Sequence, residues 1–291
     1  MNDAPITWNP NRSNPTLALP KGATDCHVHV FGPTAIFPYA PQSGFKPGDA
    51  PKEELFKLHD MLGIDRCVIV QSGCHGHDNS VVADAMAARP GRYLGIALAP
   101  PEIPNAQMAD MHAHGFRGVR FNYMSHLAPG ATHDQLRALA PRLADHGWQL
   151  LIHMESALIE DMVPVLASLP CPVVIDHMGR IDASLGMDQA PFRALMKLGE
   201  NDHIWLKVSG SERCSVQDPP YADATPFAAR LVEMFPDRTI WGTDWPHPNF
   251  RADPPDDGIL VDTLAQIAPG DALHRLLVDN PARLYDFGDL T

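Results

Sequence analysis

Residues 24–30 read TDCHVHV, a short apolar and β-branched run with two histidines two positions apart. Runs of the same kind recur at 67–71, 94–99, 118–121, 149–153, 173–176, 204–208 and 239–241. Strands of a parallel sheet that is buried on both faces read as continuous apolar runs. These eight segments therefore predict eight strands of a parallel sheet.

Segments with helical periodicity alternate with these runs. The clearest is 132–146, where Thr132 and Gln135 fit a capping box ahead of an apolar stripe. Further helices are predicted at 52–62, 79–88, 105–113, 156–169, 189–200, 221–235 and 258–267. This alternation predicts an α/β fold, a (β/α)8 TIM barrel forming a single domain over residues 23–291, behind an N-terminal extension of residues 1–22. A doubly wound sheet is the alternative, although no Gly-x-Gly-x-x-Gly or Walker A motif follows a strand.

Composition restricts the partners of the chain. Its 291 residues hold 22 Lys and Arg against 35 Asp and Glu, a net charge of −13. Binding to nucleic acid or to an anionic membrane surface requires clustered basic residues, so neither partner is expected. No signal peptide or run of about 18 apolar residues is present. Five cysteines without a Cys-x-x-Cys pair argue against a disulfide framework, and we expect a cytoplasmic protein.

The ends of the predicted strands carry the candidate catalytic residues, because barrel enzymes place their chemistry there. On a strand, His27 and His29 point to the same face and can converge on one ion or one oxygen. Asp244 follows the last strand and can accept a proton from water or bind a metal. His177 follows the sixth strand and can polarise a carbonyl. The alternatives are buried hydrogen-bonded histidines and an aspartate that caps a turn.

Arginines follow three of the strands. Arg120, Arg180 and Arg213 would bind carboxylates bidentately if they face one barrel mouth, whereas each alone is as often part of a surface ion pair. The chain lacks the Gly-x-Ser-x-Gly elbow of a serine hydrolase. Cys26 has no neighbouring base that would make it a nucleophile. Anionic substrates and water activation are thus favoured over covalent catalysis.

Five motifs together show a family resemblance. They are DCHVHVFGP at 25–33, VQSGCHG at 70–76, RGVRFN at 117–122, VIDHMGR at 174–180 and WGTDWPHP at 241–248. With them the chain resembles the lactonase branch of the amidohydrolase superfamily over almost its whole length, from Trp8 to Tyr285. The resemblance implies a distorted barrel with its active site at the C-terminal mouth.

The resemblance also implies an activity, the hydrolysis of a small anionic unsaturated lactone from aromatic catabolism, similar to a pyrone dicarboxylate or a muconolactone. In this reading Asp244 deprotonates the attacking water, and His27, His29 and His177 polarise the lactone carbonyl. The substrate is held by residues at the other strand ends, namely Arg120, Arg180, Arg213, Ser72 and Asn122. The sequence does not indicate the oligomeric state.

Three positions depart from the pyrone-hydrolysing members of this branch. Phe45 and His153 stand where those members have tyrosine, and His126 stands where they have arginine. Phe45 and His126 remain candidate substrate contacts with altered chemistry. His153 would complete a four-ligand metal set with His27, His29 and Asp244, which suits zinc or manganese. The resemblance therefore allows one divalent metal, or no cofactor at all, as in the pyrone-hydrolysing members.

Other functions stay open. A member acting on a sulfonated muconolactone with bound zinc is the nearest alternative. Zinc-dependent decarboxylases and hydratases of ring-derived acids also carry a histidine at the fifth strand, and they would be distinguished by release of CO2. A barrel that only binds its ligand is a third reading, which the retained Asp244 argues against.

Overall fold

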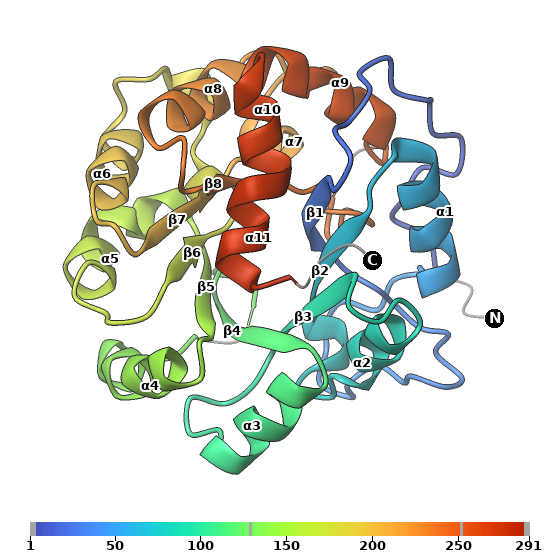
Figure 1. The fold of residues 1–291 in the computed structure, drawn as a ribbon, viewed down its shortest axis with the longest axis vertical. Coiled ribbons are helices and arrows are strands. Elements are labelled where there is room, and N and C mark those ends of the chain that lie inside the picture. The colour runs from blue at the N-terminus through green and yellow to red at the C-terminus, as the bar shows by residue number, and fades with distance from the viewer. Residues whose placement is uncertain (1–3, 128–129, 251–252, 288–291) are drawn as a thin grey trace.

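The computed structural model describes residues 4–127, 130–250 and 253–287. Within them eight parallel strands follow one another in chain order around a ring (Figure 1). The strands are β1 (Thr24–Val28), β2 (Arg66–Val70), β3 (Tyr93–Ala97), β4 (Phe116–Tyr123), β5 (Gln149–Met154), β6 (Val173–Ile175), β7 (Ile204–Lys207) and β8 (Thr239–Ile240). Each predicted strand is present to within two residues at either end, and the predicted barrel is confirmed.

The ring closes where the segment after β8 meets β1. The amide of Cys26 donates to the Trp241 carbonyl at 2.8 Å, and the amide of Asp244 donates to the His27 carbonyl at 2.8 Å. A Cβ atom on Gly242 would lie 2.4 Å from the backbone nitrogen of His27, so only glycine allows this approach. Ring closure therefore places Asp244 beside the two histidines of β1.

Helices surround the ring. They are α1 (Lys52–Leu62), α2 (Ser80–Ala87), α3 (Asn105–Ala113), α4 (His133–Asp145), α5 (Ile159–Leu166), α6 (Ala190–Gly199), α7 (Ser211–Cys214), α8 (Thr225–Met234), α9 (Asp257–Ile267), α10 (Asp271–His274) and α11 (Asn280–Tyr285). Short 3₁₀ turns occur at Gly73–His75, Ser156–Leu158, His177–Arg180 and Ala183–Leu185, and a π-helical turn covers Arg275–Asp279. The capping box of Thr132 and Gln135 is present. The helix expected from residue 221 begins only at Thr225, because Tyr221 has a left-handed φ of 60° that a helix does not allow.

The C-terminal helix α11 closes one end of the barrel. In Figure 1 it crosses the middle of the ring, and Leu284 and Tyr285 pack with Val68 and Val70 in the interior. The side-chain Nε2 of Gln149, the first residue of β5, donates to the Leu284 carbonyl at 2.6 Å. Because strands begin at this end, the opposite end, where they terminate, is the mouth available for chemistry.

The N-terminal segment before β1 packs along α9. The amide of Ser13 donates to the Asp256 carboxylate at 3.0 Å, and the amides of Thr16 and Leu17 donate to Asp262 Oδ1 at 2.8 Å. These bonds tie the start of the chain to the element that follows β8. Among the described residues no helix has the length and apolarity needed to cross a membrane.

Candidate active site

The histidines of β1 face Asp244 at the mouth. His27 Nε2 lies 3.3 Å from His29 Nε2. Asp244 Oδ1 lies 3.6 Å from His27 Nε2 and 3.5 Å from His29 Nε2. All three side chains are buried. The i, i+2 spacing on a strand thus brings both imidazoles to one carboxylate oxygen.

Two further histidines complete this cluster. His177 Nε2 lies 3.7 Å from Asp244 Oδ1, and its Nδ1 is 3.0 Å from the Ser209 hydroxyl. The ring of His153 lies 5.6 Å from that of His177, between centroids. The Nδ1 of His153 is 3.0 Å from Asn122 Oδ1. The structure therefore brings together every residue predicted for catalysis, together with the predicted metal ligand on β5.

Hydrogen-bond partners fix which ring nitrogen carries the proton in the neutral histidines. His29 Nδ1 donates to the Val70 carbonyl at 2.7 Å, so its Nε2 presents a lone pair. His153 Nδ1 donates to Asn122 Oδ1 in the same way, and its Nε2 is buried without a hydrogen-bond partner among the described residues. His27 has the opposite arrangement, because the Lys207 ammonium is 3.0 Å from its Nδ1. The Nε2 of His27 is then an N–H donor.

A buried ion network lies behind His27. Lys207 Nζ is 3.0 Å from Asp176 Oδ1, and Arg120 Nε donates to Asp176 Oδ2 at 2.9 Å. Burial opposes the charge on Asp176, but Lys207, His27 and Arg120 hold its pKa well below the ordinary value. No local sequence pattern predicts a role for Lys207 or Asp176, although both stand at strand ends. Their partnership with His27 spans up to 180 positions, which no local pattern indicates.

The pKa shifts in the cluster are those expected of a carboxylate base surrounded by neutral imidazoles. Burial and the Lys207 ammonium lower the pKa of His27 to about 3. Burial also lowers the pKa of His29, His153 and His177. Burial alone would raise the pKa of Asp244, but the Arg213 guanidinium and the surrounding histidines hold it well below the ordinary value. At neutral pH the site contains an ionised carboxylate facing uncharged rings.

Two of the predicted arginines share a cavity beside this cluster. Arg180 and Arg213 line a cavity of about 380 Å³, which the acidic residues Glu155 and Asp182 also line. Arg213 donates through Nε to Asp244 Oδ2. Its Nη2 is buried and has no hydrogen-bond partner in the described part of the chain. The cavity therefore offers guanidinium donors to an anion next to the candidate base.

The remaining predicted substrate contacts lie around the mouth. Ser72 is buried directly after β2, and its hydroxyl accepts from the Cys74 amide at 3.5 Å. Phe45 is half-buried and packs edge-on against Phe31 at 6.0 Å between centroids. Asn122 orients His153, as described above. His126 is exposed, and Arg120 is bound through Nε to Asp176.

A second buried cluster was not predicted. His247 Nε2 lies 3.1 Å from Asp257 Oδ1, and His247 Nδ1 lies 3.8 Å from Glu212 Oε1. Burial opposes the charged form of His247, but Asp257 and Glu212 raise its pKa to about 9. The one feature of the sequence that points to His247 is its position in the motif after β8. Its two partners lie in α7 and α9, far from it in the sequence or outside the motif.

The spacing of three donor atoms fits a divalent metal. Zinc bonds of 2.0–2.2 Å in a tetrahedron place neighbouring ligand atoms about 3.4 Å apart. The atoms His27 Nε2, His29 Nε2 and Asp244 Oδ1 are separated by 3.3 to 3.6 Å. The group His27, His177 and Asp244 also has converging donor atoms. Lone pairs on His29 and His153 suit a metal, whereas the contact with Lys207 favours His27 as an N–H donor.

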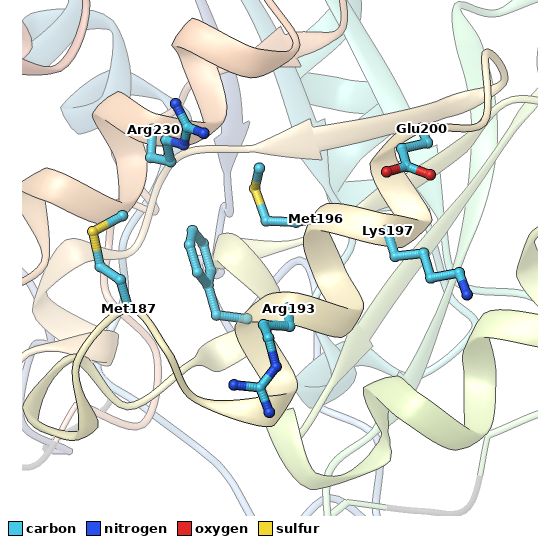
Figure 2. A pocket seen from close by; sticks show the side chains of 7 residues that line it. Met187, Arg193, Met196, Lys197, Glu200 and Arg230 are labelled. Atoms are coloured by element: carbon cyan, nitrogen blue, oxygen red, sulfur yellow. The ribbon is translucent and has the colours of Figure 1, made fainter.

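A larger cavity of about 430 Å³ lies away from the mouth, on the outer side of α6 (Figure 2). Met187, Glu200 and Arg230 line it together with Arg193, Met196 and Lys197 of α6. It contains none of the clustered histidines or the candidate base. We therefore place the candidate active site at the barrel mouth and not in this groove.

Comparisons with known proteins show the family. The amidohydrolase family model matches residues 24–287, and the chain belongs to this family. It is 44% identical to 2-pyrone-4,6-dicarboxylate hydrolase of Comamonas testosteroni, over 96% of this chain and 95% of the relative. It is 41% identical to 4-sulfomuconolactone hydrolase of Rhizobium radiobacter, over 94% and 93%. The apo crystal structure of Agrobacterium tumefaciens ATU3138 superposes with a TM-score of 0.84 at 28% identity, covering 95% of this chain and all of that one.

Proposed function

We propose that the protein is a lactonase that hydrolyses a small lactone carrying anionic groups. The observation that carries the proposal is the Asp244 carboxylate, 3.5 to 3.7 Å from the Nε2 atoms of three buried histidines. A carboxylate kept ionised at neutral pH can accept a proton from water. The arginine-lined cavity next to it supplies a place for the negative charge of the substrate.

The reaction follows from these groups. Asp244 accepts a proton from water as the water oxygen attacks the lactone carbonyl carbon. The N–H of His27 donates to the carbonyl oxygen, which becomes negatively charged in the tetrahedral intermediate. When that intermediate collapses, the bond between the carbonyl carbon and the ring oxygen breaks. The departing ring oxygen takes the proton from Asp244, and the product is the open-chain acid.

The names of the similar proteins define the substrates to test. We infer a pyrone dicarboxylate or a sulfonated or carboxylated muconolactone as the substrate, because each is an unsaturated lactone with anionic groups. Arg180, Arg213 and Arg120 are the candidate partners of those groups, with Ser72 and Asn122 beside them. Phe45, His126 and His153 are the positions at which we expect discrimination between these lactones.

A bound metal is the alternative source of electrophilic assistance. His29, His153 and Asp244 would hold it, together with His27 if Lys207 gives up its contact. Zinc or manganese in such a site lowers the pKa of bound water and polarises a carbonyl. Asp244 and the arginine cavity keep their roles in substrate binding and proton transfer in either case.

The proposal is tested by ring opening of 2-pyrone-4,6-dicarboxylate, followed by its ultraviolet absorbance with purified protein. Fast loss of absorbance without release of CO2 supports the lactonase and excludes a decarboxylase. The same rate after chelation shows that His153 does not hold an essential metal. If the metal-loaded protein opens neither the pyrone nor a sulfonated or carboxylated muconolactone, the proposed function is wrong.

A further inference from the structure

The turn that follows β8 holds Asp244 in a conformation that needs support. The φ angles of Asp244 and His247 are 63° and 55°, in the left-handed region that residues other than glycine adopt only when their surroundings hold them there. β1 supports the first half of the turn, because the Asp244 amide donates to His27 and the His29 amide donates to Trp245. The second half ends at His247, whose amide donates to the Asp244 carbonyl at 2.7 Å.

The side chain of His247 anchors this second half. It lies between two helices, with Nε2 at 3.1 Å from Asp257 in α9 and Nδ1 at 3.8 Å from Glu212 in α7. All three side chains are fully buried. An imidazole held between two buried carboxylates resists displacement, because moving it leaves buried polar atoms without partners.

Helix α7 contacts both ends of the turn, Asp244 and His247. Glu212 faces His247, and the next residue, Arg213, donates from Nε to the Asp244 carboxylate. Arg213 Nε also lies 3.6 Å from Glu212 Oε1. Donor atoms of Glu212, Asp244 and His247 converge within 4.8 Å, a spacing that could hold a metal, but the Arg213 guanidinium already supplies positive charge there. One short helix thus fixes both the carboxylate and the residue that terminates its turn.

We propose that His247 is a positioning residue for Asp244. Held by Asp257 and Glu212, it sets the turn so that the Asp244 carboxylate faces the three histidines. This inference rests on the proposed function, because it takes Asp244 as the group that accepts the proton from water. The anionic groups of the substrate are bound in the arginine cavity, so loss of His247 changes the chemical step more than substrate affinity.

The kinetic test compares His247→Ala and His247→Gln with a matched control. A displacement of about 1 Å at a reacting group costs up to about 100-fold in rate, so we expect the alanine variant to lower kcat at least tenfold with KM within twofold. Glutamine keeps an N–H donor for Asp257 and should restore part of kcat. His203→Ala is the control, and its kcat should not change. His203 is half-buried, directly precedes β7 and forms a hydrogen bond with the Leu166 carbonyl. An unchanged kcat in His247→Ala, or a KM that rises as much as kcat falls, overturns the inference.

Fluorescence gives a second test that does not depend on activity. Trp245 lies within the turn, is fully buried, and packs against Trp8 at 6.1 Å between centroids. Its emission is isolated by subtracting the spectrum of the matching Trp245→Phe variant. We expect a red shift in His247→Ala and none in His203→Ala, and an unshifted spectrum overturns the inference. If the wild-type protein hydrolyses no lactone but the shift appears, the proposed function fails and the anchoring of the turn stands.

A milder variant is available if His247→Ala does not fold. Asp257→Asn keeps an oxygen that accepts from His247 Nε2 and removes one of the two negative charges. It should lower kcat about threefold to tenfold without raising KM, since the bond to His247 remains but is weaker without the charge. An unchanged kcat in this variant contradicts the role of the Asp257 charge in holding the turn.

Discussion

Three candidate site residues have a left-handed backbone. The φ angles are 49° at His177, 56° at Arg180 and 63° at Asp244. Such conformations cost about 1–3 kcal/mol each and are stable only when the surrounding structure enforces them. At His177 the enforcement includes Gly210, where a Cβ atom would lie 2.8 Å from the His177 Cβ. At the scale of the residue, the fold contains three unfavourable backbone conformations, and these direct the three side chains toward the mouth.

Replacing Asp244 by asparagine should remove the base and leave the binding cavity intact. The amide cannot accept a proton, so we expect kcat to fall by about 100-fold or more. Arg180 and Arg213 remain to hold the anion, so calorimetric affinity for a non-reacting substrate analogue should change little. A kcat within tenfold of the wild type would assign the base to another residue.

Replacing Lys207 by methionine should destabilise the protein strongly. It leaves the buried Asp176 with Arg120 as its charged partner and the His27 imidazole at 3.4 Å, and removing one member of a buried ion pair costs about 3–5 kcal/mol. Urea unfolding measures the difference. Lys57→Met is the control, because that lysine pairs with Glu54 at the surface and should cost about 1 kcal/mol or less. Equal losses in the two variants would show that the buried network contributes little.

At the scale of the element, strands and helices contribute differently to the candidate site. β6 has three residues and β8 has two, yet the segments that follow them carry His177 and Asp244. Helix α4 is longer and carries a complete capping box, and none of the candidate site residues lies on it. The capped helix α4 thus lies apart from the candidate site, while the short strands end where the candidate site residues begin.

Replacing Thr132 by alanine tests this separation. The Thr132 hydroxyl accepts from the Gln135 amide at 3.2 Å, and loss of such a cap costs about 1 kcal/mol. We expect a lower urea midpoint with an unchanged kcat. Thr16→Ala is a matched exposed control, since Thr16 donates through its backbone amide, which alanine retains. A reduced kcat in Thr132→Ala would show that α4 influences the mouth.

At the scale of the whole molecule, an acidic chain places two arginines in one cavity at the mouth. The chain carries a net charge of −13, but Arg180 and Arg213 meet in one cavity at the mouth. Local fields in a cleft determine which ligands enter, so an acidic protein can select an anion. Helix α11 closes the opposite end of the barrel, which leaves the mouth as the place where substrate and water meet.

The pH dependence of stability should show a maximum near pH 6.5. His27 has its pKa lowered to about 3, so below pH 6.5 the unfolded chain binds more protons and stability falls until about pH 3. His247 has its pKa raised to about 9, so its contribution is complete below pH 6.5 and is lost as pH rises through 9. Melting temperature measured across pH 4 to 10 tests both limbs. The alkaline limb should weaken in His247→Gln, and an unaltered limb would contradict its assignment to His247.

Much of the fold and part of the site could be predicted from the sequence. The strand runs and the capping box of Thr132 have local patterns, and both are present. The closing helix α11 was not predicted, because α10, a π-helical turn and α11 form a broken sequence of short elements without a clear period. The roles given to His27, His29, His153, His177 and Asp244 remain predictions, although the structure places these residues in one cluster.

The sequence by itself determined the order of the strands and which chemical groups stand at their ends. Those features depend on hydrophobic periodicity and residue type, which are local. Only the tertiary structure decided the proton positions on the histidines, the pairing of Lys207 with Asp176 and His27, and the clamp of Glu212 and Asp257 on His247. Those contacts join residues from separate elements, and ring closure brings them together in a buried space where an unpaired polar group is costly.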